Sequence, residues 1–181
     1  DRDPVIARWA LRDLSPQAGI AHGPDGFRED MLAQALRHPS ASVRAQALRV
    51  RGTTPDAAYT GLIRDALLDA SASVRAVAIH AARQLDMDAR AVFRDAIDRG
   101  ESPWNRHALQ ALGDCADAED LDRLQPWLHH PAGESRCAAL RGALRAGIDD
   151  PAGVLREALT SPSGKVVSLA LKLGATVPSF M

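Results

Sequence analysis

The sequence repeats itself at an interval of about 30 residues, and this periodicity constrains the fold more than any other feature. The segments HPSASVRAQAL (38–48) and DASASVRAVAI (69–79) are nearly identical copies from two successive intervals. Four columns of apolar residues keep this spacing over five registers. The columns are Leu32, Ile63, Phe93, Leu124 and Leu155; Leu36, Leu67, Ile97, Leu128 and Leu159; Ala47, Ala78, Ala108, Ala139 and Ala170; and Leu48, Ile79, Leu109, Leu140 and Leu171. The chain is therefore predicted to be an array of one repeated structure.

Each repeat is predicted to consist of two helices. In the first, apolar residues follow the i, i+3, i+4 pattern of a helix face, as Leu32, Ala35 and Leu36 do. A short turn rich in Pro, Ser, Gly and His comes next, and the second helix has its own stripe, which includes Val74 and Ala78. Aromatic residues make up only 4% of the chain, and clusters of strand-favouring residues are scarce. The expected fold class is all-α.

The repeats are expected to form one domain over residues 1–181. A lone helix at 4–14 has the stripe of a second helix without a first helix before it, so it either caps the array or is what remains of a longer one. The chain begins with Asp1, which leaves open both a processed product and a fragment. A loop is expected at 15–25 and a tail at 176–181. The five repeats are expected at 26–52, 55–86, 87–116, 117–147 and 149–175.

The second helices resemble those of HEAT repeats, whose signature is V-R-x-x-A. The signature is met at Val43, Arg44 and Ala47 and again in the next repeat, and it weakens where Trp104 or Ser135 takes the place of Val. The resemblance covers nearly the whole chain. The short period resembles that of the compact bacterial HEAT-like proteins of the phycobilisome lyase type. The resemblance implies a right-handed α-solenoid of the armadillo-like helical class, with about five helix pairs plus the N-terminal helix, and a role in protein–protein interaction.

Two positions depart from this pattern. HEAT repeats often carry a turn aspartate before the V-R pair, and Asp69 matches it. Other residues stand at the equivalent positions, namely His38, Arg99, His130 and Ser161. A continuous ladder of Asp–Arg pairs is therefore not expected. The second departure is Trp104, which replaces Val43 and Val74 and is interpreted as a local core residue.

The charges divide between the two helix layers although the net charge is only -1. The second-helix segments hold 13 basic and 2 acidic residues, and the remainder holds 9 basic and 21 acidic residues. These segments are 4–14, 40–52, 71–85, 102–113, 133–147 and 164–174. In HEAT solenoids the second helices line the concave face, so the resemblance implies that this face is the basic one.

Two columns on the second helices are the candidate binding residues. The first holds Arg44, Arg75, Asn105, Arg136 and Val167, and the second holds Arg49, His80, Gln110, Arg141 and Lys172. The resemblance implies a structural role for the first column. The second column is polar in every copy. For its side chains, pairing with neighbouring residues and binding of a ligand both remain open. The predicted binding set on the concave face is Arg44, Arg49, Arg75, His80, Gln110, Arg136, Arg141 and Lys172.

Catalytic and metal-binding patterns are missing from the sequence. It contains no G-x-x-x-x-G-K-[ST], G-x-G-x-x-G, G-x-S-x-G or H-E-x-x-H motif. Cys115 and Cys137 stand alone, and His129 with His130 has no further ligand at suitable spacing. We therefore expect no enzyme activity, no catalytic residue, no metal and no cofactor.

The function expected from these observations is that of a non-catalytic binding scaffold or adaptor. Its partner would be another protein or an acidic segment of a longer parent chain, held by the basic face. A nucleic-acid-binding module is the alternative, and a chromophore-lyase-like subunit is a further one for which no catalytic residue can be named. The sequence has neither an apolar stretch long enough to span a membrane nor a signal peptide, so we expect a cytoplasmic protein without membrane contact.

Overall fold

The structure is a computed structural model that describes residue 5 and residues 27–51, 57–100 and 103–177. The predicted loop at 15–25, the predicted lone helix at 4–14 apart from Val5, and the last four residues of the predicted tail lie outside the described residues. The described part is all-helical and contains no strand. The predicted all-α fold class is therefore confirmed.

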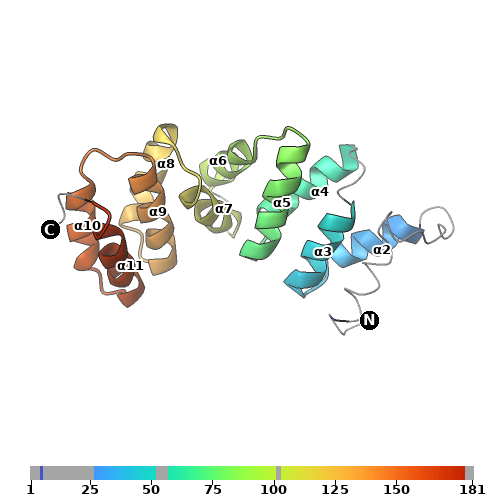
Figure 1. Ribbon diagram of the computed structural model, residues 1–181, viewed down its shortest axis with the longest axis horizontal. Coiled ribbons are helices and arrows are strands. Elements are labelled where there is room, and N and C mark those ends of the chain that lie inside the picture. Colours follow the sequence, from blue (N-terminus) through green and yellow to red (C-terminus); the bar gives the residue numbers. More distant parts are fainter. Residues whose placement is uncertain (1–4, 6–26, 52–56, 101–102, 178–181) are drawn as a thin grey trace. The chain divides into compact units, whose positions relative to one another are not determined.

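Five helix pairs follow one another along the described chain (Figure 1), and each pair lies within one of the predicted repeats. The first helices of the pairs are α2 (Phe27–Leu36), α4 (Ala57–Leu67), α6 (Ala89–Arg99), α8 (Leu121–Leu128) and α10 (Pro151–Leu159). The second helices are α3 (Ala41–Arg51), α5 (Ala72–Gln84), α7 (Trp104–Gly113), α9 (Gly133–Arg145) and α11 (Gly164–Gly174). A short 3-10 helix, η2 (Ala118–Asp120), leads directly into α8.

The chain divides into two compact units, residues 1–89 (unit 1) and 90–181 (unit 2). In unit 1, α2 packs on α3, α4 packs on α5, and the second helices α3 and α5 pack on each other. In unit 2, α8 packs on α9 and α10 on α11, while α9 lies between the second helices α7 and α11. Helix-on-helix stacking of this kind is that of an α-solenoid. The right-handed sense and the single domain stay predictions.

The repeated apolar columns form the cores of both units. Every alanine of the third column is 0% exposed: Ala47, Ala78, Ala108, Ala139 and Ala170. Small side chains at this position let the helices approach closely, and the larger residues of the first column fill the space between them. That column is also buried throughout, at Leu32, Ile63, Phe93, Leu124 and Leu155.

Leu171 is the one member of the four columns that is exposed, whereas the other members are buried or half-buried. Leu109 and Leu140 are buried at the equivalent positions of unit 2, whereas Leu171 is 57% exposed. The reason is the position of its helix, because α11 has α9 on one side and no further described second helix on the other.

Trp104 is not the core residue that the sequence predicts. Its side chain is 42% exposed, whereas Val43 and Val74 at the equivalent positions are 1% exposed. The two valines are the third residues of α3 and α5, but α7 begins at Trp104 itself. The indole therefore lies at the open end of its helix, where fewer neighbouring side chains can cover it.

Candidate binding surface on the second helices

The first-column arginines hold the turns between helices together. In unit 1, Arg44 on α3 donates from Nε and Nη2 to the two carboxylate oxygens of Asp69, both at 2.8 Å. Its Nη1 donates to the carbonyl oxygens of His38 and Pro39 at 2.8 and 2.9 Å. Arg75 on α5 is 6% exposed and donates to the carbonyl oxygens of Asp69 and Ala70 at 2.7 and 3.1 Å. These donors are thus directed into the fold.

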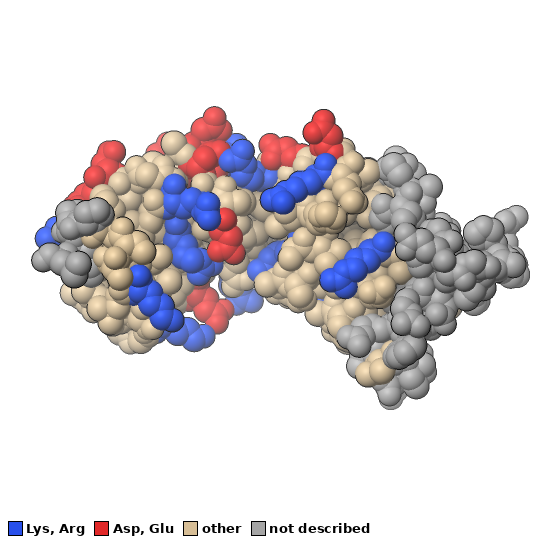
Figure 2. Space-filling view, in the orientation of Figure 1, with Lys and Arg blue, Asp and Glu red and all other residues tan. Residues whose placement is uncertain are grey.

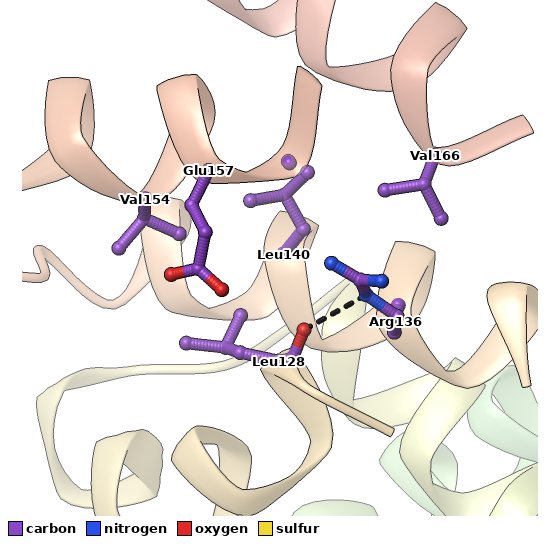
Figure 3. Close-up of a pocket in the computed structure, with 7 residues that line it drawn as sticks. Leu128, Arg136, Leu140, Val154, Glu157 and Val166 are labelled. Atoms are coloured by element: carbon purple, nitrogen blue, oxygen red, sulfur yellow. Dashed lines mark hydrogen bonds between the residues drawn. The ribbon is translucent and has the colours of Figure 1, made fainter. Parts of the chain in front are cut away.

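Arg136 has the same place on α9 in unit 2 but a different partner. Its Nε donates to the carbonyl oxygen of Leu128 at 2.9 Å (Figure 3), and its Nη1 donates to Ser161 Oγ at 3.1 Å. Ser161 lies 25 residues after Arg136, and Asp69 likewise lies 25 residues after Arg44. The Asp–Arg ladder is therefore discontinuous, as the sequence predicts: it has a carboxylate at one described position and a neutral hydroxyl at the other.

A larger ion-pair network in unit 2 links α6 to η2, and it was not predicted from the sequence. Arg94 donates from Nε to Asp120 at 2.6 Å, and its other nitrogens reach Asp117 and Glu119 at 3.0 and 3.1 Å. Asp120 is 0% exposed. Arg90 also pairs with Asp117. A signal was available, because the sequence separation of Arg94 and Asp120 is close to that of Arg44 and Asp69.

The ion pairs and hydrogen bonds of this network stabilise the charged forms of Asp120 and Arg94. Burial alone would raise the pKa of Asp120, but hydrogen bonds from Arg94 and from the Asp117 amide lower it overall. The pKa of Arg94 is raised, chiefly by its hydrogen bond to Asp120. Both groups are therefore ionised at neutral pH, and they fix the start of the fourth repeat against α6.

The second column of candidate residues lies at the surface. In unit 1, Arg49 and His80 are exposed, and the His80 ring lies 3.2 Å from Gln84 Nε2. In unit 2, Lys172 is exposed, and Gln110 is half-buried. Within the described ranges neither Arg49 nor Lys172 has an ion-pair partner. The structure thus separates the predicted binding set into buried or turn-bound first-column residues and surface second-column residues.

Arg141 completes the second column and lies in an ion pair. Its Nε donates to Asp114 Oδ1 at 3.0 Å, which joins α9 to the residue that follows α7. The two side chains are 36% and 69% exposed, so water screens this pair strongly. Figure 2 shows Lys and Arg side chains on the visible face of each unit, with Asp and Glu side chains among them.

Two hollows occur in the described part of unit 2. A cavity of about 10 Å³, large enough for a single water molecule, lies between α8, α9, α10 and α11. Figure 3 shows the carboxylate of Glu157 and the guanidinium of Arg136 on either side of it, and Glu157 pairs with His129 Nδ1 at 2.9 Å. The second hollow is an open groove of about 830 Å³ between the C-terminal ends of α9 and α11.

The described residues offer little reactive or metal-binding chemistry. No group of three or more His, Cys, Asp or Glu side chains among them could hold a metal ion. Cys115 and Cys137 are free thiols, and burial raises the pKa of each. A thiol of this kind is mostly protonated at neutral pH and is therefore a weak nucleophile.

The stacked helix pairs and the polar surface of their second helices define the class of helical-repeat proteins. The V-R pairs and the turn contacts of Arg44 and Arg75 specify the family more closely. Residues 29–113 match the family model described as HEAT repeats, and α8 to α11 continue the same columns. Residues 29–113 of this chain are therefore HEAT repeats. No curated protein matches it significantly. None of the described helices has both the length and the apolar character that crossing a membrane requires.

Proposed function

We propose that this protein is a non-catalytic scaffold whose second helices bind an acidic segment, either of another protein or of a longer parent chain. HEAT repeats are in general protein-interaction scaffolds, and the finer proposal concerns the surface that is used. One observation carries it: the second column is polar and lies at the surface, whereas the first-column arginines are bound inside the fold.

The proposed binding residues are therefore a subset of those expected from the sequence. Arg49 and His80 would act in unit 1, and Gln110, Arg141 and Lys172 in unit 2. Arg44, Arg75 and Arg136 would support the surface by fixing the turns. Cationic side chains on neighbouring second helices attract carboxylates and guide their approach, and most of this effect falls on the rate of association.

The test compares captured partners between charge-reversed variants. Arg49→Glu with Lys172→Glu reverses, in each unit, one cation that has no ion-pair partner among the described residues. Arg64→Glu with Arg156→Glu is the matched control, because both arginines are exposed on first helices, α4 and α10. Both double variants should keep the circular dichroism of the wild type. We expect the tagged wild type and the control to retain the same proteins from native lysate, and the Arg49/Lys172 variant to lose them.

Nuclease treatment and salt titration separate the alternative. A protein partner should stay bound after nuclease treatment, and its affinity should fall only moderately with salt. If capture is abolished by nuclease, or if log affinity falls steeply and linearly with log salt concentration, the surface binds nucleic acid. If both double variants retain their partners equally, the second-helix surface is not the binding site.

A further inference from the structure

The open groove of unit 2 combines apolar residues with two arginines and one aspartate. Its floor includes Leu144 on α9, Ile148 in the following turn, and Leu173 and Val177 at the end of α11. All four side chains are half-buried. Leu144, Leu173 and Val177 also pack against the core cluster of the last two repeats. The floor is thus an exposed extension of the hydrophobic core, and it is built on packed helices.

Arg141 and Arg145, one helical turn apart on α9, stand at the edge of this groove. Asp114 also lines the groove and neutralises Arg141. Arg145 is exposed, and no described residue forms an ion pair or hydrogen bond with its side chain. Among the described residues, the groove therefore has one positive charge, that of Arg145, without a paired carboxylate next to its apolar floor.

The lining indicates which class of ligand the groove fits. Its volume of about 830 Å³ lies in the range of pockets that bind ligands through an apolar surface and a few polar groups. None of the described residues that line it is aromatic, so they offer no surface on which bases could stack. One unpaired cation among the described lining residues is also too little to follow a phosphate backbone. A peptide is favoured, with an apolar side chain for the floor and a carboxylate for Arg145.

We propose that this groove is the docking site for a protein segment that carries a large aliphatic side chain next to an acidic residue. The inference rests on the proposed scaffold function and adds that one segment of the partner binds in this groove. The aliphatic side chain would cover Leu144, Ile148, Leu173 and Val177. The carboxylate would pair with Arg145, in the charge-assisted geometry that a guanidinium favours.

The probe is a short fluorescein-labelled peptide with one Leu and two Glu in a Gly/Ser background, titrated into the full chain and followed by fluorescence polarisation. Replacing the peptide's Leu by Gly, or its Glu residues by Gln, should weaken binding about tenfold or more, because each change removes one of the two contacts. Arg145→Glu and Val177→Ser in the protein should have effects of similar size. Arg156→Glu is the control: it makes the same charge change on α10, outside the groove.

Backbone amide shifts of the isotope-labelled chain locate the bound peptide. The proposal requires shifts at residues 141–148 and 173–177, lost in Arg145→Glu while circular dichroism and thermal midpoint stay those of the wild type. Val177→Ser, which leaves every charge in place, separates loss of the apolar floor from loss of charge.

Several results would overturn the proposal. Binding that follows only the number of Glu residues and weakens equally in Arg156→Glu would reveal an unselective cationic surface. A dimer in sedimentation that Arg145→Glu dissociates would make a second copy the occupant. If Arg145→Glu and Val177→Ser retain all lysate partners while the Arg49/Lys172 variant loses them, the groove inference fails and the scaffold function stands. If neither the two groove variants nor the Arg49/Lys172 variant loses its partners, the scaffold proposal itself fails.

Discussion

Arg44 and Asp69 join two successive repeats of unit 1 through a two-pronged ion pair, with both nitrogen–oxygen distances at 2.8 Å. The side chains are only 16% and 15% exposed, so water screens the pair less than an ordinary surface ion pair. The same carboxylate accepts the backbone N–H of Ser71 at 2.7 Å, just before α5 begins. One aspartate thus connects the turn, the following helix and the preceding repeat.

Replacing Asp69 by Asn should lower the free energy of unfolding of unit 1 by about 1–3 kcal/mol, because hydrogen bonds to a charged acceptor contribute in that range. Hydrogen exchange of the α3 and α5 amides measures the change within this unit. Asp65→Asn is the control, since Asp65 is an exposed carboxylate on α4. Equal effects of the two substitutions would show that the ion pair adds nothing to stability.

The contribution of Asp69 should also depend on pH. Burial alone would raise its pKa, but hydrogen bonds from Arg44 and from the Ser71 amide lower it overall. A carboxyl group with a lowered folded-state pKa stabilises the fold fully above its unfolded-state pKa of about 4, and this is lost as the pH falls through the folded-state value. The stability difference between wild type and Asp69→Asn should therefore be constant around neutral pH and shrink in strong acid. A difference that is unchanged in acid would contradict this assignment.

Ser161→Asp should stabilise unit 2 by about 1 kcal/mol, since it gives Arg136 the carboxylate that Arg44 already has. Ser161 Oγ accepts from Arg136 and from the Ser163 amide, which are the same two kinds of donor that bind Asp69. Ser168→Asp on the exposed face of α11 provides the control for added charge. The gain, measured by urea unfolding, should disappear in an Arg136→Gln background. A gain that persists there would have another origin.

Asp120→Asn should destabilise unit 2 by about 1–3 kcal/mol, because a fully buried acceptor loses the charge that strengthens its hydrogen bond from Arg94, while Arg94 keeps Asp117 and Glu119 as partners. The substitution weakens the bond from Arg94 at 2.6 Å and changes the acceptor of the Asp117 amide at 3.0 Å. Asp122→Asn on the exposed side of α8 should change stability little. Thermal unfolding followed by circular dichroism compares the two variants. Similar midpoints would mean that the network carries no net stability.

Gly113→Ala should destabilise unit 2 by about 1–3 kcal/mol, the range of an overpacked core. A Cβ atom at Gly113 would lie 2.5 Å from the carbonyl oxygen of Ala138, and this backbone atom of α9 has little room to move. Gly61→Ala on α4 is a control with the opposite sign, since its Cβ meets nothing within 4 Å and Ala favours the helix. Chemical denaturation should separate the two. A neutral Gly113→Ala would show that α7 and α9 can move apart at no cost.

The fold was predictable because its determinants repeat along the sequence. Ala47 and Ala78 occupy equivalent positions in successive repeats, so each copy supports the interpretation of the other. Trp104 could not be placed in this way, because its exposure depends on where α7 begins, and the regular spacing of the repeats does not reveal that. The Arg94–Asp120 pair was missed for a related reason: its two residues stand outside the apolar columns that define the repeat.

The candidate surface was predictable only in part. The sequence places Arg44 and Arg49 on the same helix but does not show that one binds a turn while the other faces solvent. Burial of Arg44 depends on Asp69, which belongs to the next repeat. The groove beside Arg145 was not predictable at all, since it arises where α9, α11 and the turn between α9 and α10 come together.

The exposure of Leu171 has a consequence for the order in which unit 2 loses its structure. Helix α9 is covered by second helices on both sides, whereas α11 is covered by a described second helix on one side only. Detaching the last repeat therefore disrupts fewer apolar contacts than opening the middle of the unit. Local unfolding should therefore begin at α11 and proceed toward α7. Protection of the backbone amides against solvent deuterium would then decrease from the buried Ala139 to the neighbours of Leu171, as a gradient along the chain.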